Sequence, residues 1–518
     1  MAARTRGAPR PWPLAVLTAG IMTLAVAGLI PRWPGLVQLV GLPPLGVTTD
    51  LRLLLSESEG FVPFIVMLVP ALAVRIAVLT AMTGELSARR VGFVARFYAL
   101  ALPFAGLAAA SAFAAGATLY YLLFWVGVAM TVAEVLLLAA IPWMGEPSVW
   151  RAVISAARAG FRAGTVGAYL VGVTLIGAAA EAGGPAAAIG LLPVSAAFTY
   201  AAAYLLSVDP DRRGLRVGRR IVAATGALLV TVTVAVATGP ARPVERDRPG
   251  APRSGSLMLM GGIDSSSGSS PLLSLVPGSV GFTCEQTFFF SYAGPGSGQP
   301  EGRAACPIRT GAPYTGVDTY RSIDELVRFL VEQIEPLPPP VTLIAHSQGV
   351  WVVLVALSAG LLPTVSDVVL VGALTDNPIG YPPRGGHAPG RVGTEVLDGV
   401  GALARLTSFS RFDPQSPLAV ELLADPHRVA AIVSHPIPTE MAALSVPSAF
   451  DLPLMAETRP IEGAAEACPL LAVHPELPFA PAFVDDVNRF LDGRPPAACP
   501  WWHSATVGLR AYSAPPNH

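Results

Sequence analysis

Ser347 is the residue whose surroundings in the sequence most clearly indicate chemistry. It follows an apolar run, Val341 to Ala345, and precedes an apolar segment of helical length that closes at Gly360. Small residues two positions before and after it, Ala345 and Gly349, allow the sharp strand-to-helix turn of a G-x-S-x-G elbow. Such a turn exposes the hydroxyl beside backbone N–H groups that can hold an anion. The alternative is a serine in an ordinary turn, because the bare motif is a weak signal.

The sequence around Ser347 alternates between short apolar strands and helices. This alternation predicts βαβ units and a mostly parallel sheet, with ligands beyond the carboxyl ends of the strands. We expect strands at 256–260, 286–291, 341–345, 367–373, 429–434 and 470–473. We expect helices at 322–335, 349–360, 394–406, 417–424 and 482–492.

Four features occur in a set order along 256–495. They are S-L-M-L-M running into Gly261-Gly262-Ile263, F-F-F-S-Y-A-G at 288–294, the A-H-S-Q-G elbow, and L-L-A-V-H-P-E-L-P-F at 470–479 before a terminal helix. In this order the chain resembles the α/β-hydrolase superfamily, particularly its lipase- and esterase-like members. The resemblance implies a sheet of α/β-hydrolase type and serine hydrolase chemistry.

The resemblance gives His474 the position of the catalytic base, in a loop between the last strand and a closing helix. A serine hydroxyl is a weak nucleophile and needs such a base. The oxyanion would be held by the N–H of Gln348 and by an N–H of the glycine loop, for which we choose Ile263 with Gly262 as its neighbour. Alternatively, the glycines form a plain turn before the Ser/Gly-rich stretch 264–270.

The acid that would orient His474 has three candidates in the sequence. The superfamily places an aspartate about three residues past the strand that precedes the histidine strand. With that strand at 429–434, prolines and Ile437 stand there instead. We rank Glu440 first, then Asp376, then Asp451, and a dyad or a degenerate site stays open.

Two further histidines lie near these segments. His346, inside the elbow, is expected to be structural, and His435 is the second choice for the base. The insertion 379–426 is expected either to cap the pocket or to form ordinary surface helices.

Composition places much of the chain in lipid. The 518 residues are 52% hydrophobic and 13% charged, whereas soluble domains carry roughly 25% charge. A net charge of −1 argues against a nucleic-acid partner, and all 34 basic residues are arginine, which suggests a GC-rich bacterial genome. No C-x-x-C or His/Cys cluster indicates zinc, so we expect neither a metal nor a cofactor.

An all-α transmembrane bundle of about seven helices is expected over 1–238. A linker at 239–255, an α/β domain at 256–500 and an irregular tail at 501–518 would follow. Apolar runs long enough to cross a bilayer are expected at 14–30, 61–82, 98–117, 118–141, 165–181, 186–207 and 220–238.

Arginine placement predicts the orientation of these spans. If the amino terminus is cytoplasmic, the expected outer loops hold only Arg32 and Arg52, which agrees with the positive-inside bias. Seven spans then place the second half of the chain outside the cytoplasm. Arg75 and Glu134 fall inside spans, where we expect one structural ion pair, the alternative being an ion or substrate path.

The cysteines agree with an extracytoplasmic second half. All four follow residue 283, which suggests two disulfides and an oxidising compartment; the alternative is four separate buried thiols. Cys284–Cys306 would fix the loops that flank 288–294, and Cys468–Cys499 would join the histidine strand to the tail.

The expected function is a membrane-anchored, extracytoplasmic serine hydrolase. It would cleave a lipid or another lipophilic carboxylic ester through an acyl-enzyme on Ser347, with the bilayer as its other partner. One alternative is an acyltransferase that passes the acyl group to a cell-envelope hydroxyl. The other is a non-catalytic sensor or scaffold that carries a degenerate hydrolase domain, which the missing acid favours.

Overall fold

The structure is a computed structural model. It describes residues 8–84, 86–208, 250–302, 304–307, 309–377, 379–382, 386–406, 413, 415–455 and 459–516. The chain divides into two compact units. The helical unit comprises Met1–Gly239, Gly386–Val396 and Val507–His518, and the α/β unit comprises Pro240–Gly385 and Leu397–Thr506.

The α/β unit is built on a six-stranded sheet in which every strand pair is parallel. The strand order is β2-β1-β3-β4-β5-β6. The expectation of a mostly parallel sheet is therefore confirmed. The strands are β1 Ser256–Met260, β2 Thr287–Phe289, β3 Val341–His346, β4 Val365–Val371, β5 Ala442–Val446 and β6 Ala465–Glu466.

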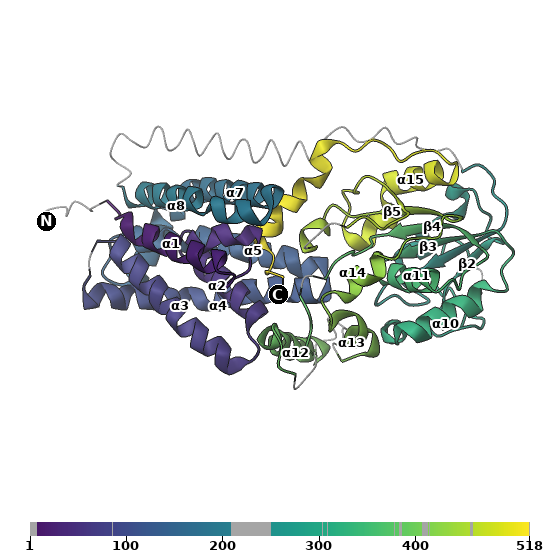
Figure 1. Cartoon of the computed structure of the whole chain (residues 1–518), viewed down its shortest axis with the longest axis horizontal. Helices are drawn as coiled ribbons and strands as arrows, with labels where there is room; N and C mark the ends of the chain where they lie inside the picture. Colours follow the sequence, from purple (N-terminus) through teal and green to yellow (C-terminus); the bar gives the residue numbers. More distant parts are fainter. Residues whose placement is uncertain are drawn as a thin grey trace. The chain divides into compact units, whose positions relative to one another are not determined.

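Helices cover both faces of this sheet (Figure 1), which explains why the central strands are continuously apolar. All residues of β1 and β3 are buried. One face packs against Phe483 and Val487 of α15, and on the other side α11 packs between α10 and α14. The helices are α10 Ile323–Ile334, α11 Gln348–Ser358, α12 Arg391–Leu406, α13 Pro417–Leu423, α14 Arg428–Val433 and α15 Pro481–Leu491.

Two of the expected strands are wrong. The run V-A-A-I-V-S, expected as a strand at 429–434, falls almost entirely on helix α14, Arg428–Val433, because a short buried apolar run has no periodicity that separates helix from strand. The fifth strand is instead β5, whose small residues gave a weak signal. The strand expected at 470–473 is reduced to a single bridge between Leu470 and Ser448, and β6 lies before it.

The helical unit contains four helices that are long and apolar enough to cross a membrane: Phe61–Met82, Ala88–Thr118, Tyr121–Trp143 and Gly160–Gly190. In α3, Val62 and Val66 are 72% and 64% exposed, as expected for side chains that face lipid. The described part of the chain does not confirm a count of seven, and the span expected at 220–238 lies outside it. The helices are α1 Trp12–Val26, α2 Leu45–Glu57, α3 Phe61–Met82, α4 Ala88–Thr118, α5 Tyr121–Leu138, α6 Val149–Arg158, α7 Ala163–Gly190 and α8 Leu192–Ser207 (Figure 1).

The segment expected as an outer loop at 31–60 is folded and buried. The 3-10 helix Pro34–Val40 is wholly buried, and α2 packs against α4, α3 and α5. Arg52 of α2 is 1% exposed, so it lies in the interior of the helical unit. It therefore should not be counted among the loop charges that indicate membrane orientation. The orientation of the spans stays a prediction.

The ion pair expected between Arg75 and Glu134 is wrong. Arg75 donates through Nε and Nη2 to both carboxylate oxygens of Asp50 on α2, each at 2.7 Å, and Glu134 accepts instead from the hydroxyl of Thr48 at 2.8 Å. The error follows from the missed helix α2, which supplies both Asp50 and Thr48.

Both expected disulfides are present, Cys284–Cys306 and Cys468–Cys499. The tail expected to be irregular forms a 3-10 helix, Trp501–Tyr512. Residues from Val507 onward belong to the helical unit, as does part of the insertion expected to cap the pocket, Gly386–Val396.

The Arg75–Asp50 pair gives a test of this interior. We expect Asp50→Asn to lower the free energy of unfolding by about 3–5 kcal/mol, because it leaves a buried guanidinium without its carboxylate. Glu134→Gln is the matched control and should change it by less than about 1 kcal/mol, since the amide oxygen still accepts from Thr48. Thermal unfolding in detergent measures both, and equal losses would contradict the observed pairing.

Candidate active site

The predicted site residues lie at the carboxyl ends of four strands that run in register. Met260 of β1 pairs with Ala345 of β3, Ala345 pairs with Leu370 of β4, and Leu370 pairs with Ser445 of β5. The residues two positions further on, among them Gly262, Ser347 and Gly372, therefore leave the sheet side by side at the carboxyl ends of their strands. Parallel sheets bind ligands at this edge.

Ser347 occupies a strained turn between β3 and α11. Its φ is 58° and its ψ is −126°. For a residue with a side chain, this backbone conformation costs about 1–3 kcal/mol. Its N–H donates to Val371 O at 2.8 Å, and helix α11 begins at the next residue, Gln348. Ser347 thus stands at a helix amino terminus, where backbone N–H groups lack intrahelical acceptors.

Two glycines allow the backbone to approach this turn closely. A Cβ on Gly262 would lie 2.6 Å from Ser347 Cβ and 3.1 Å from its Oγ. A Cβ on Gly349 would lie 2.9 Å from Gly261 O. The loop after β1 therefore passes directly against Ser347, where the predicted oxyanion donors were expected.

His474 is held by a carboxylate, and the carboxylate is that of Asp451. His474 Nδ1 lies 2.5 Å from Asp451 Oδ2, with side-chain exposures of 12% and 3%. Burial by itself lowers the pKa of His474, but the charge and the hydrogen bond of Asp451 outweigh it, so the net effect is a raised pKa. With Nδ1 oriented toward Asp451, the other ring nitrogen, Nε2, points away from the carboxylate.

His474 lies over the ends of β3 and β4, next to the Ser347 turn. A Cβ on Gly372 would lie 2.9 Å from His474 Cε1, and the rings of His346 and His474 are 4.9 Å apart between centroids. His346 Nε2 lies 3.0 Å from His474 O, so this nitrogen carries a proton and donates it. Burial, then the nearby charge of His474, lowers the pKa of His346 to about 3, which keeps it neutral. This buried, hydrogen-bonded position agrees with the structural role expected for His346.

The loops that carry Asp451 and His474 are hydrogen-bonded to each other. Ser448 Oγ donates to Ala472 O at 3.0 Å, and Ala449 N donates to Leu470 O at 3.0 Å. The hydroxyl of Thr506 also donates to Ala449 O. Asp451 and His474 therefore lie on two loops that hydrogen bonds hold together at the carboxyl ends of the strands.

The glycine loop is held in place by Tyr292. This tyrosine is fully buried, and its hydroxyl donates to Gly261 O at 2.6 Å. Burial raises the pKa of Tyr292 well above its ordinary value, so it stays protonated and remains a donor. Because the N–H of a trans peptide points opposite to its C=O, this bond also fixes the direction of the Gly262 N–H.

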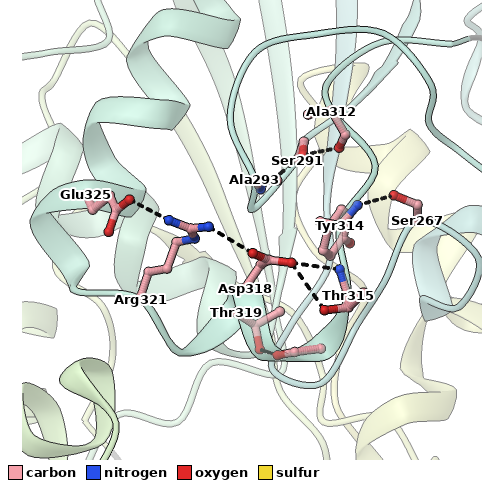
Figure 2. Close-up of polar contacts among 11 residues, drawn as sticks. Ser267, Ser291, Ala293, Ala312, Tyr314, Thr315, Asp318, Thr319, Arg321 and Glu325 are labelled. Carbon is pink, nitrogen blue, oxygen red and sulfur yellow. Dashed lines mark hydrogen bonds and ion pairs between the residues drawn. The ribbon is translucent and has the colours of Figure 1, made fainter.

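A second brace comes from the segment 314–321, whose polar contacts are drawn in Figure 2. Thr315 N donates to Asp318, and Arg321 bridges Asp318 at 2.9 Å and Glu325 at 2.7 Å. The backbone carbonyl of Thr319, in this segment, accepts a hydrogen bond from Gln348 Nε2 at 2.6 Å. Its hydroxyl accepts from Asp264 N at 3.1 Å. One ordered turn thus contacts both sources of the predicted oxyanion donors.

The acid candidate ranked first lies elsewhere. Glu440 is exposed and precedes β5, at the edge of the sheet opposite to the carboxyl end where Ser347 lies. Its placement was wrong because the strand expected before it is α14. Asp376 is buried in the segment after β4, whereas the third candidate, Asp451, follows β5 and bonds His474.

The remaining predicted residues are Ile263, His435 and two of the cysteines. Ile263 is 37% exposed beside Gly262. His435 lies after α14, where its Nδ1 is 2.9 Å from Ala431 O. The sulfurs of Cys468 and Cys499 and a nitrogen of His503 cluster within 4.8 Å of one another. These sulfurs form a disulfide and offer no thiolate, so the cluster does not fit a metal ion.

No protein-family model matches this chain, and neither the curated proteins nor the solved structures contain a significant match to it. The function must therefore be argued from the site itself.

The Asp451–His474 contact predicts the titration of the imidazole. Wild-type His474 should titrate above 6.5. Asp451→Asn should move the midpoint below that value, because burial remains while the compensating negative charge is gone. Ring-proton NMR of histidine-labelled protein measures the shift. Glu440→Gln is the control and should leave the midpoint unchanged.

Proposed function

We propose that this protein is a membrane-bound serine hydrolase that cleaves carboxylic esters. The observation that carries the proposal is the contact between His474 and Asp451 beside the strained turn of Ser347. A nucleophile, a base and an orienting acid from three different strand ends form the arrangement that serine hydrolases use on unrelated folds. The order of the motifs along the chain adds the resemblance to lipase- and esterase-like α/β-hydrolases.

In the proposed mechanism, Ser347 Oγ attacks the ester carbonyl carbon while His474 Nε2 takes the hydroxyl proton. Asp451 holds the imidazole in the required tautomer and stabilises the imidazolium. The N–H of Gln348 and an N–H of the glycine loop, from Gly262 or Ile263, stabilise the oxyanion. His474 then protonates the leaving alkoxide, which leaves an acyl-enzyme.

Water completes the reaction. His474 Nε2 takes a proton from a water molecule as that water attacks the acyl carbonyl. The second tetrahedral intermediate then releases the carboxylic acid while His474 returns the proton to Ser347 Oγ. The irregular acid loop was the main reason for a non-catalytic alternative. The contact of Asp451 with His474 supports hydrolysis over that alternative.

A lipid or lipophilic ester is the proposed substrate class. Four apolar helices indicate that the chain inserts into a membrane, which would hold the site near lipid-soluble esters. The two disulfides favour an oxidising, extracytoplasmic location for the α/β unit.

A fluorophosphonate probe tests the nucleophile. The purified full-length protein should be labelled at Ser347, and Ser347→Ala should abolish the labelling, because the probe reacts with an activated serine hydroxyl. Peptide mass spectrometry identifies the labelled residue. A folded protein that takes up no label would refute the proposal.

Ester hydrolysis tests the acid. Asp451→Asn should lower kcat by about 10⁴-fold, as loss of an orienting carboxylate does in related triads. Glu440→Gln should stay within about twofold of wild type, because Glu440 lies at the opposite edge of the sheet. Hydrolysis of a short-chain chromogenic ester in detergent measures both variants, and the reverse ranking would assign the acid role to Glu440.

A further inference from the structure

Several residues of the segment 507–516 are buried inside the helical unit. Ala511, Tyr512 and Ala514 are 0%, 3% and 2% exposed. The hydroxyls of Tyr512 and Thr174 lie 2.8 Å apart, and Arg510 forms an ion pair with Glu181. Because buried backbone groups need hydrogen-bond partners, the surrounding helices must supply contacts to these residues.

Arg52 is the centre of this contact. Its Nη1 donates to Ala511 O at 3.0 Å and to Ser513 O at 3.5 Å, and its Nη2 donates to Gln38 Oε1 at 2.6 Å. Among the described residues no carboxylate forms an ion pair with Arg52, and its Nε has no hydrogen-bond partner. A buried guanidinium is unfavourable unless acceptors surround it, and the tail supplies two of them through its backbone carbonyls.

Glycines make room for the tail. A Cβ on Gly177 of α7 would lie 2.5 Å from Ala511 Cβ, and a Cβ on Gly35 would lie 2.9 Å from Ala511 O. On the tail itself, a Cβ on Gly508 would lie 2.9 Å from Ala178 Cβ. Small residues on both partners allow close packing between the tail and the helices.

We infer that the helical unit is a receptor for the carboxyl-terminal peptide of its own chain. Residues 507–514 are its ligand, recognised through two backbone carbonyls by Arg52 and through close packing at Gly35 and Gly177. The α/β unit is thereby retained by a non-covalent tether at residues 507–514, in addition to the linker that precedes it and to residues 386–396, which also belong to the helical unit. This role would explain why the helical unit is larger than a single anchor, and it does not depend on the proposed hydrolase activity.

Trypsin cleavage at Arg510 tests the docking in the full-length protein. The wild-type chain should release the peptide A-Y-S-A-P-P-N-H slowly, because Arg510 is held against Glu181. Gly177→Val should speed its release about tenfold or more, since the added methyl groups displace Ala511. Gly167→Val is the matched control on the same helix, where a Cβ would meet nothing within 4 Å, and it should release the peptide at the wild-type rate.

A second variant distinguishes loss of docking from misfolding of the helices. Gly508→Val places the added bulk on the tail and leaves the sequence of α7 unchanged, and it should also release the peptide about tenfold faster than wild type. Mass spectrometry of the released peptide measures each rate. Release at the wild-type rate from both Gly177→Val and Gly508→Val would overturn the inference.

The tether is tested by cutting the linker. With a protease site inserted between residues 241 and 249, the cleaved wild-type protein should keep its carboxyl-terminal fragment bound to the helical fragment during purification. Gly177→Val and Gly508→Val should increase the loss of this fragment about tenfold, and Gly167→Val should not. Equal retention in all variants would overturn the tether.

Discussion

The register of four parallel strands is the constraint on which the candidate site depends. Because β1, β3, β4 and β5 pair without displacement at Met260, Ala345, Leu370 and Ser445, their following loops emerge side by side. A slip of one residue would turn each side chain to the other face of the sheet. The close approach of Gly262 to Ser347, and of Gly372 to His474, requires these ends to remain aligned.

Local structure with strong sequence signals was predicted well. The turn at Ser347 is marked by small residues on both sides, and His474 by its place before a closing helix. The structure places Gly262 against the serine and forms both expected disulfides. These features depend on a few neighbouring residues, so a single sequence is enough to indicate them.

The misplaced residues depend on elements whose sequence signal is weak. The low rank of Asp451 follows from expecting a strand at 429–434 before the acid loop, whereas that run is helical and the true strand β5 has the plain sequence A-A-L-S-V. The expected partner of Arg75 is wrong for a similar reason, because the buried helix α2 occupies a segment expected to be an exterior loop. In both cases the deciding contact joins segments far apart in the chain, and burial rather than local preference determines the structure.

The proposed chemistry depends on two small assemblies that meet at Gly372. The first holds Ser347 and its neighbouring N–H groups, and it is fixed by the strained turn, by Gly262 and by the bond from Tyr292 to Gly261. The second holds Asp451 and His474, and it is fixed by the hydrogen bonds between their loops. Each assembly is internally constrained, so the geometry between them is set by the contact of His474 with the end of β4. Gly372 has a φ of 61° and no room for a Cβ there, which makes it the residue that allows the base to lie beside the nucleophile turn.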